Sequence, residues 1–159
     1  MRKKFSWKVV MTSVETPHIA GAQPDFPTAK NMGERLWGEE TLLCHVQQKF
    51  IMKKLFVKKG CKGGLQYHRF KDEAGFLLSG RMIIRYDNGK GGLCEKIVIP
   101  GDVFHFSPGV VHQEEALEDC VIIEASTPIF NDRVRMEKDY ELGEPHGMPT
   151  TAASEVEFG

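Results

Sequence analysis

The chain has 159 residues, a length typical of one domain, and 41% of them are hydrophobic, which is enough to bury a core. Lys and Arg total 21 against 22 Asp and Glu, so the formal net charge is -1. This balance gives no electrostatic basis for binding nucleic acid or an anionic membrane surface. No apolar run is long enough to cross a bilayer, so we expect no membrane span.

The N-terminus begins with the basic run Met1 to Lys4, as secretory signals do. The apolar stretch that follows, Phe5 to Met11, contains Ser6 and Lys8 and is too short and too polar for an export signal. The four cysteines are widely spaced and form no CxxC pair, which favours reduced thiols. We therefore expect a cytoplasmic protein.

Residues 1–38 form the first of three zones, an irregular N-terminal arm. Pro17, Pro24 and Pro27 interrupt any regular element there. The arm has room for one short helix near Thr28 to Leu36.

Residues 39–127 differ, because short apolar runs alternate with turn clusters about every ten residues. This spacing is typical of an antiparallel sandwich or barrel, and it predicts an all-β jelly roll of eight strands. The predicted strands cover Leu42 to Val46, Phe50 to Val57, Leu65 to His68, Phe76 to Leu78, Met82 to Tyr86, Ile97 to Ile99, Val103 to Phe106 and Val121 to Glu124.

Residues 128–159 form a C-terminal segment that is charged at first, then small and polar over Thr150 to Ser154. We expect its end to be disordered or to wrap around a partner subunit.

Four residues of the predicted barrel could converge on one metal ion. Gln66 and His68 are two apart, so on a strand both side chains point to the same face. Glu73 follows after a short bend, and His112 lies just past the turn at Ser107 to Gly109. Each residue taken singly is more often structural than a ligand. Together they offer one amide oxygen, two imidazoles and one carboxylate to a divalent ion.

The spacing of these residues resembles the two motifs of the cupin superfamily. The segment from Gly60 to Gly80 reads GCKGGLQYHRFKDEAGFLLSG, and the segment from Gly101 to His112 reads GDVFHFSPGVVH. Two positions depart from the usual pattern: Gln66 replaces the first histidine, and Ser107 replaces a proline. The resemblance implies a double-stranded β-helix, or cupin barrel, that holds one divalent ion (Zn, Mn, Fe or Ni).

The Gln-x-His pair is similar to that of cupins related to mannose-6-phosphate isomerase. The run Trp37 to Glu40 and the closing segment Asp132 to Tyr140 also resemble these sugar isomerases. The resemblance implies a metal-dependent isomerase or epimerase whose partner is a small sugar or sugar phosphate. A homodimer is the default expectation for such a protein.

Three further residues are candidates for the chemistry. Lys54 precedes the Gln-x-His by one strand, as a lysine does in the isomerases, although it could equally be a solvated strand lysine. Glu124 lies in the apolar run of the last strand and either enters the cavity or faces solvent. Arg135 could bind a sugar phosphate through its bidentate guanidinium.

Two other functions stay open, because a fold does not fix a function. One is a non-catalytic cupin that binds a metal or a sugar. The other is an iron-dependent cupin dioxygenase, since two histidines and a carboxylate form the ligand set of many oxygenases.

Overall fold

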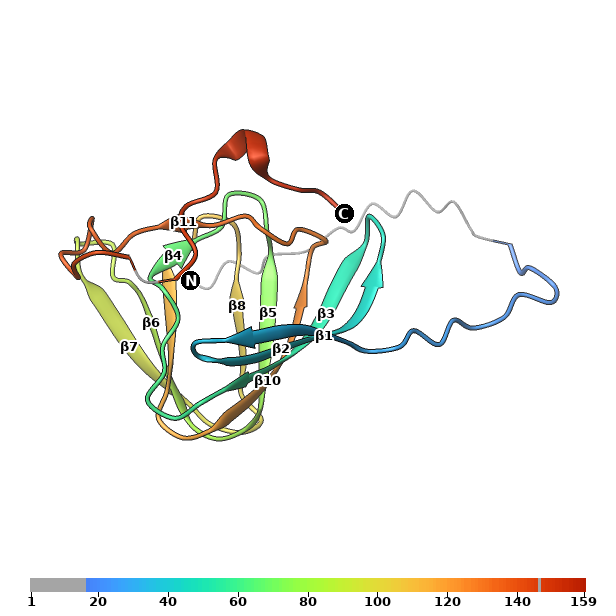
Figure 1. The fold of residues 1–159 in the computed structure, drawn as a ribbon, viewed down its shortest axis with the longest axis horizontal. Coiled ribbons are helices and arrows are strands. Elements are labelled where there is room, and N and C mark those ends of the chain that lie inside the picture. Colours follow the sequence, from blue (N-terminus) through green and yellow to red (C-terminus); the bar gives the residue numbers. More distant parts are fainter. Residues whose placement is uncertain (1–16, 146) are drawn as a thin grey trace, which may run out of the picture.

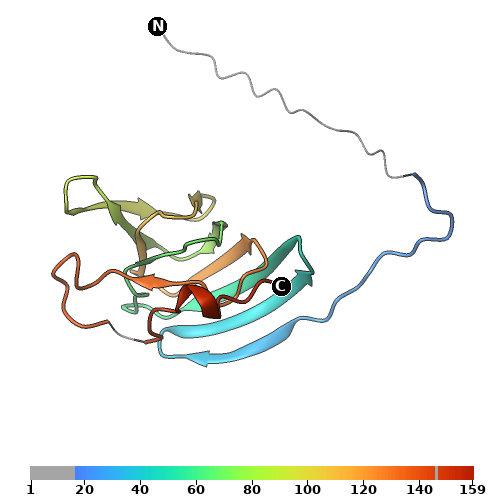
Figure 2. The same cartoon turned by 90° about the horizontal axis from the view of Figure 1, so that it is seen from above.

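The computed structural model describes residues 17–145 and 147–159. The segment Phe5 to Met11, where an export signal was considered, lies outside these residues. Residues 17–29 are exposed and run away from the body of the molecule (Figure 2). The described residues contain no helix that is long and apolar enough to cross a membrane.

Two antiparallel sheets form the molecule, as the alternation of apolar runs and turns predicts (Figure 1). The six-stranded sheet contains, in spatial order, β1 (Lys30–Arg35), β2 (Gly38–Val46), β3 (Phe50–Val57), β10 (Cys120–Ser126), β5 (Glu73–Ser79) and β8 (Val103–Phe106). The five-stranded sheet contains β11 (Val134–Arg135), β4 (Gln66–Tyr67), β9 (His112–Ala116), β6 (Met82–Asp87) and β7 (Leu93–Val98).

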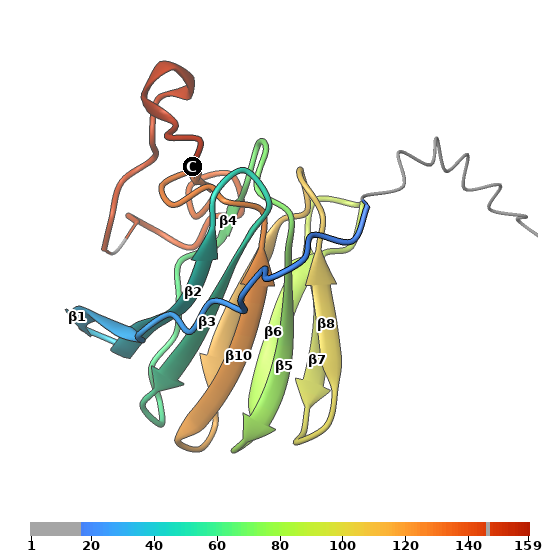
Figure 3. The same cartoon turned by 90° about the vertical axis from the view of Figure 1, so that its right-hand side faces the viewer.

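Strands distant in the sequence lie side by side, as a jelly roll requires. Strand β10 pairs with both β3 and β5, and β9 pairs with both β4 and β6. Figure 3 shows β3, β10, β5 and β8 next to one another. The inner faces of the two sheets enclose one apolar core: Val57, Leu77, Met82, Ile84, Val98, Phe106, Ala116, Cys120 and Ile122.

The helix expected near Thr28 to Leu36 is wrong, because this segment forms β1 and pairs with β2. Gly33 has a φ of +95° and lies where the register shifts between Asn31 and Glu34. A positive φ is incompatible with a right-handed helix but suits a bulge in a strand.

The C-terminal segment packs onto its own barrel rather than extending from it. β11 pairs with β4, Ile129 bridges to Phe158, and the Gly159 N–H donates to the Pro128 carbonyl at 2.7 Å. The short 3-10 helix Ala153–Glu155 (red in Figure 1) rises over one end of the molecule. The expectation of a disordered end is therefore wrong for the residues described here, whereas contact of this segment with a partner subunit stays a prediction.

Candidate metal centre

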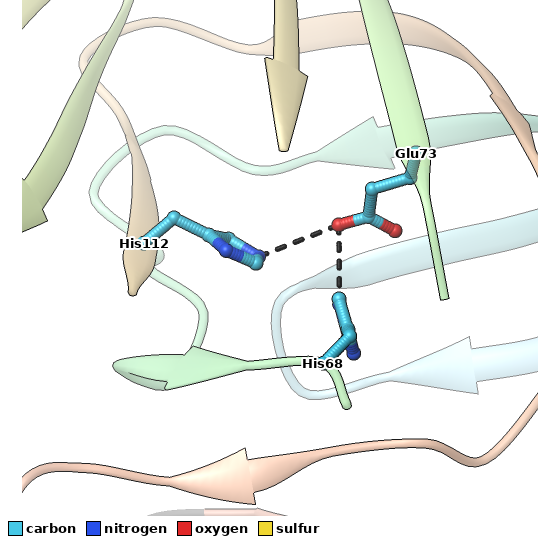
Figure 4. Close-up of side chains that lie close together, drawn as sticks. All are labelled: His68, Glu73 and His112. Carbon is cyan, nitrogen blue, oxygen red and sulfur yellow. Dashed lines mark hydrogen bonds and ion pairs between the residues drawn. The ribbon is translucent and has the colours of Figure 1, made fainter. Parts of the chain in front are cut away.

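Three of the four predicted ligands converge in the interior of the barrel (Figure 4). His68 follows β4, Glu73 begins β5 and His112 begins β9, so the two sheets each contribute to the cluster. One ligand atom from each residue lies within 4.8 Å of the others, and all three side chains are buried.

The orientation of both imidazoles is fixed by main-chain carbonyls. The His112 Nδ1 lies 2.9 Å from the Val110 carbonyl oxygen, and the His68 Nδ1 contacts the Asp132 carbonyl oxygen. A carbonyl oxygen only accepts hydrogen bonds, so each Nδ1 carries the proton and donates it. In its neutral form, each ring then presents an Nε2 lone pair, which is the arrangement found in many metal-binding histidines.

Both Nε2 atoms face the same carboxylate oxygen. Oε1 of Glu73 lies 3.2 Å from His68 Nε2 and 3.4 Å from His112 Nε2. Three acceptors at these distances have no proton to share while the rings are neutral, so a cation between them satisfies all three. The donor set of two imidazoles and one carboxylate fits a divalent transition metal such as zinc, manganese, iron or nickel.

The fourth predicted ligand, Gln66, lies next to this cluster in the sheet. Its Cα partner across the β4–β9 pair is His112. Residues directly opposite each other share a face of the sheet, so Gln66 points to the same side as His112. Coordination by its amide oxygen stays a prediction.

A buried lysine completes the charge arrangement around Glu73. The Lys71 ammonium contacts Oε2 of Glu73 and lies 3.0 Å from Oε1 of Glu124. Burial by itself raises the pKa of Glu73, but Lys71 and then the two imidazoles hold that pKa well below its usual value. Glu73 is therefore an anion, with Oε2 paired to Lys71 and Oε1 facing the histidines.

Protons compete with a metal at this site. Burial by itself lowers the pKa of His112, but hydrogen bonding to Glu73 and the charges of nearby carboxylates raise it above its usual value. The same lone pair that would bind the metal accepts this proton.

Glu124 faces the interior, the first of the two placements considered for it. Glu73, Glu114 and Glu124 line one small enclosed cavity of about 10 Å³. This is about the volume that one water molecule needs. Burial and the neighbouring charges of Glu73 and Glu124 raise the pKa of Glu114, although His112 opposes them.

Lys54 is not brought to the centre. Along β3, Ile51 and Lys53 are buried while Met52 and Lys54 are exposed, so Lys54 lies on the outer face of the sheet. The inward neighbour, Lys53, forms an ion pair with Glu40 at 2.6 Å. Because alternate residues of a strand point to opposite faces, the geometry does not support Lys54 as a catalytic group.

The side chain of Arg135 forms an internal ion pair and a hydrogen bond to the main chain. Its guanidinium pairs with Glu137 and donates to the Met148 carbonyl at 3.1 Å. Gly64 leaves the space that the guanidinium occupies, since a Cβ there would lie 2.1 Å from it. Phosphate binding by Arg135 stays a prediction that requires this internal pair to open.

The sequence analysis did not identify Lys71 as part of the site, because its pattern does not differ from that of a solvated lysine. In the structure Lys71 is buried. Lys71 precedes β5, so the strand period of two does not predict where its side chain points. Glu114 was also missed, although it lies on β9 two residues after His112, where that period predicts the same face. Both residues are polar at inward positions, which apolar patterning does not detect.

Comparison with known proteins identifies the fold. No family model matches the chain, and no curated protein matches it. Among solved structures, KdgF from Halomonas sp. superposes with a TM-score of 0.54 and 17% identity, over 61% of this chain and 85% of that one. An RmlC-like cupin from Shewanella frigidimarina gives 0.51 and 18%, over 62% and 81%.

Longer proteins match over only part of their length. The capsular polysaccharide assembling protein CapF from Staphylococcus aureus gives a TM-score of 0.56 and 20% identity, over 64% of this chain and 28% of CapF. Oxalate decarboxylase from Bacillus subtilis gives 0.52 and 20%, over 62% and 27%. Identities this low establish the fold alone, which is that of the cupins. The two segments that resemble the cupin motifs therefore lie in a barrel of the expected fold.

Proposed function

We propose that the protein is a metal-dependent isomerase or epimerase that acts on a small sugar or sugar phosphate. The observation that carries this proposal is the Lys71–Glu124 ion pair beside the His68, Glu73 and His112 cluster. Isomerisation of a sugar moves a proton between adjacent carbons, so it needs a base next to an electrophile. Glu124, a candidate base, and Glu73, a candidate ligand of the ion that would act as the electrophile, line the same small cavity.

The residues have separate roles in this proposal. His68, Glu73 and His112 would hold a divalent ion, with Gln66 as the fourth ligand, and the ion would polarise the substrate carbonyl as a Lewis acid. The Glu124 carboxylate, held by Lys71 at 3.0 Å, takes the proton from the carbon next to the carbonyl and returns it to the neighbouring carbon. Lys71 keeps the Glu124 carboxylate in place without using the oxygen of Glu73 that faces the histidines.

Deuterium incorporation tests this function. The metal-loaded protein is incubated in heavy water with a panel of aldoses, ketoses and their phosphates, and nuclear magnetic resonance detects deuterium at C1 or C2. We expect exchange into one substrate, and we expect Glu124→Gln to slow it about 10²–10⁴-fold while the metal is retained. Lys54→Met, on the outer face, is the matched control and should leave the rate unchanged.

A second candidate is a non-catalytic metal-binding cupin, and the small size of the enclosed cavity favours it. About 10 Å³ admits a water molecule but not a sugar ring. If no sugar in the panel exchanges while the metal site is full, the isomerase proposal fails and this candidate replaces it.

A third candidate is an iron-dependent oxygenase, because two histidines and one glutamate match the ligand set of that class. Oxygen uptake by the iron-loaded protein, with no exchange into any sugar, would favour this candidate over the other two.

A further inference from the structure

A second cleft lies between β8 of the six-stranded sheet and β6 and β7 of the five-stranded sheet. Its volume is about 220 Å³, and residues of β6, β7 and β8 line it. The apolar part of the lining comprises Ile84, Val98, Val103, Phe104, Phe106 and Val110. None of the predicted metal ligands contributes to this lining.

The volume of the cleft is sufficient for one aromatic ring. A dry apolar cavity of about 150 Å³ is sufficient to bind benzene, so this cleft has room for a ring with a short substituent. Phe104 and Phe106 lie with their ring centroids 5.3 Å apart and their planes tilted by 38°. Tilted rings at this separation offer edges and faces against which a ligand ring can pack.

The rim of the cleft supplies one cation for the substituent. Lys96 lies on β7 opposite Ile84 and lines the cleft from the inner side of the sheet. It takes part in none of the ion pairs seen among the described residues. Other polar side chains of the rim already have partners: His105 lies 2.6 Å from Asp72, and Asp102 accepts the Ile99 N–H at 3.1 Å.

We propose that this cleft binds a monocyclic aromatic carboxylate, with the ring against Phe104 and Phe106 and the carboxylate at Lys96. The site goes beyond the function proposed above, because it uses neither the metal ligands nor Glu124. It is nevertheless in contact with the centre. Phe106 stacks on the ring of His112, with ring centroids 3.9 Å apart and an interplanar angle of 8°. A ligand ring packed against Phe106 therefore lies one side chain away from a candidate metal ligand.

Titration with benzoate and benzyl alcohol tests the charge contribution. Nuclear magnetic resonance measures both affinities for the full, metal-free chain, for Lys96→Met and for the outer-face control Lys54→Met. We expect benzoate to bind the wild type more tightly than benzyl alcohol. Lys96→Met should weaken benzoate about two- to fivefold, as for an exposed ion pair, and leave benzyl alcohol unchanged. Lys54→Met should change neither affinity.

Histidine ring signals locate the ligand in the same titration. Benzoate should shift the ring resonances of His112, which stacks on Phe106, and of His105, which lines the cleft. The signal of His45, which packs against Phe130, should stay in place. Absence of benzoate binding, equal affinity of the two probes for the wild type, or an unshifted His112 signal would each overturn the proposal.

Discussion

Main-chain carbonyls, rather than side chains, orient the two histidines of the centre. The carbonyls of Val110 and Asp132 accept from the Nδ1 atoms of His112 and His68. The Asp132 carboxylate also accepts the N–H groups of Phe70 and Lys71 at 2.6 and 3.0 Å. A single residue of the C-terminal segment therefore fixes the loop between the first two ligands, and metal affinity depends on residues well outside the motif.

Removal of one imidazole should abolish tight metal binding. His112→Ala leaves one histidine, Glu73 and the predicted ligand Gln66, so we expect the affinity for Zn²⁺ to fall at least about 100-fold, more than the loss typical of supporting residues. Calorimetric titration of the metal-free protein measures this. His105→Ala, which removes an exposed histidine, is the control. Equal losses in the two variants would show that the centre is placed wrongly.

A buried lysine, Lys71, and an exposed lysine, Lys54, should contribute very differently to the free energy of unfolding. Lys71→Met leaves Glu73 and Glu124 without their buried counter-charge, which typically costs about 3–5 kcal/mol of unfolding free energy. Lys54→Met on the outer face should change it by less than about 0.5 kcal/mol. Urea unfolding at pH 7 with chelator present measures both, and a Lys71 variant as stable as the Lys54 variant would contradict the buried network.

The strands position the site through their turns. Gly80 joins β5 to β6 with a φ of +88°, and a Cβ at that position would lie 2.3 Å from the Asp119 carbonyl oxygen. Only glycine satisfies both conditions. Gly89, in the turn between β6 and β7, has a φ of +71° but open space around it.

Alanine substitutions at Gly80 and Gly89 should distinguish the cost of a positive φ from the cost of a steric clash between Cβ and the backbone. Gly89→Ala adds only the strain of a positive φ, about 1 kcal/mol. Gly80→Ala adds the collision with backbone, so we expect a total loss of about 3 kcal/mol or more. Urea unfolding of the two variants checks the difference, and equal losses would show that the β5–β6 turn is looser than described.

The sequence predicted apolar strands well and polar strands poorly. The run Phe50 to Val57 forms β3 with the predicted bounds, because its alternation of apolar side chains is strong. Strand β9 was not predicted, because His112, Gln113, Glu114 and Glu115 carry no hydrophobic signal. Its inward polar residues line the site, so the chemistry of the centre hid the strand from apolar patterning.

Motif spacing predicted three candidate ligands that converge, but not the groups around them. His68, Glu73 and His112 converge as the cupin-like spacing implies. The choice of Lys54 depended on the resemblance to the isomerases, and a shift of one residue on a strand reverses the face. Lys53 rather than Lys54 therefore points inward.

At the scale of the whole molecule, the centre joins the two sheets. Glu73 belongs to the six-stranded sheet, whereas His112 belongs to the five-stranded sheet. A metal bound by both ties the sheets together in the native state only, because the unfolded chain does not preserve the arrangement.

Metal should therefore stabilise the fold. At a concentration about 100 times the dissociation constant, binding adds about 2.7 kcal/mol to the unfolding free energy. For a chain of this size the melting temperature rises by about 5–10 °C. Calorimetry with and without chelator measures the shift, which should disappear in His112→Ala. A chelator-insensitive melt of a metal-loaded wild type would contradict this coupling.

The most direct test of the centre is anomalous scattering from a crystal soaked with Mn²⁺ or Zn²⁺. We expect one anomalous peak in the barrel interior, about 2.0–2.6 Å from Nε2 of His68, Nε2 of His112 and Oε1 of Glu73. The Lys71 ammonium should remain on the other carboxylate oxygen of Glu73. A fully soaked crystal with no peak at these three atoms, or with its peak on residues outside the barrel interior, would contradict the account.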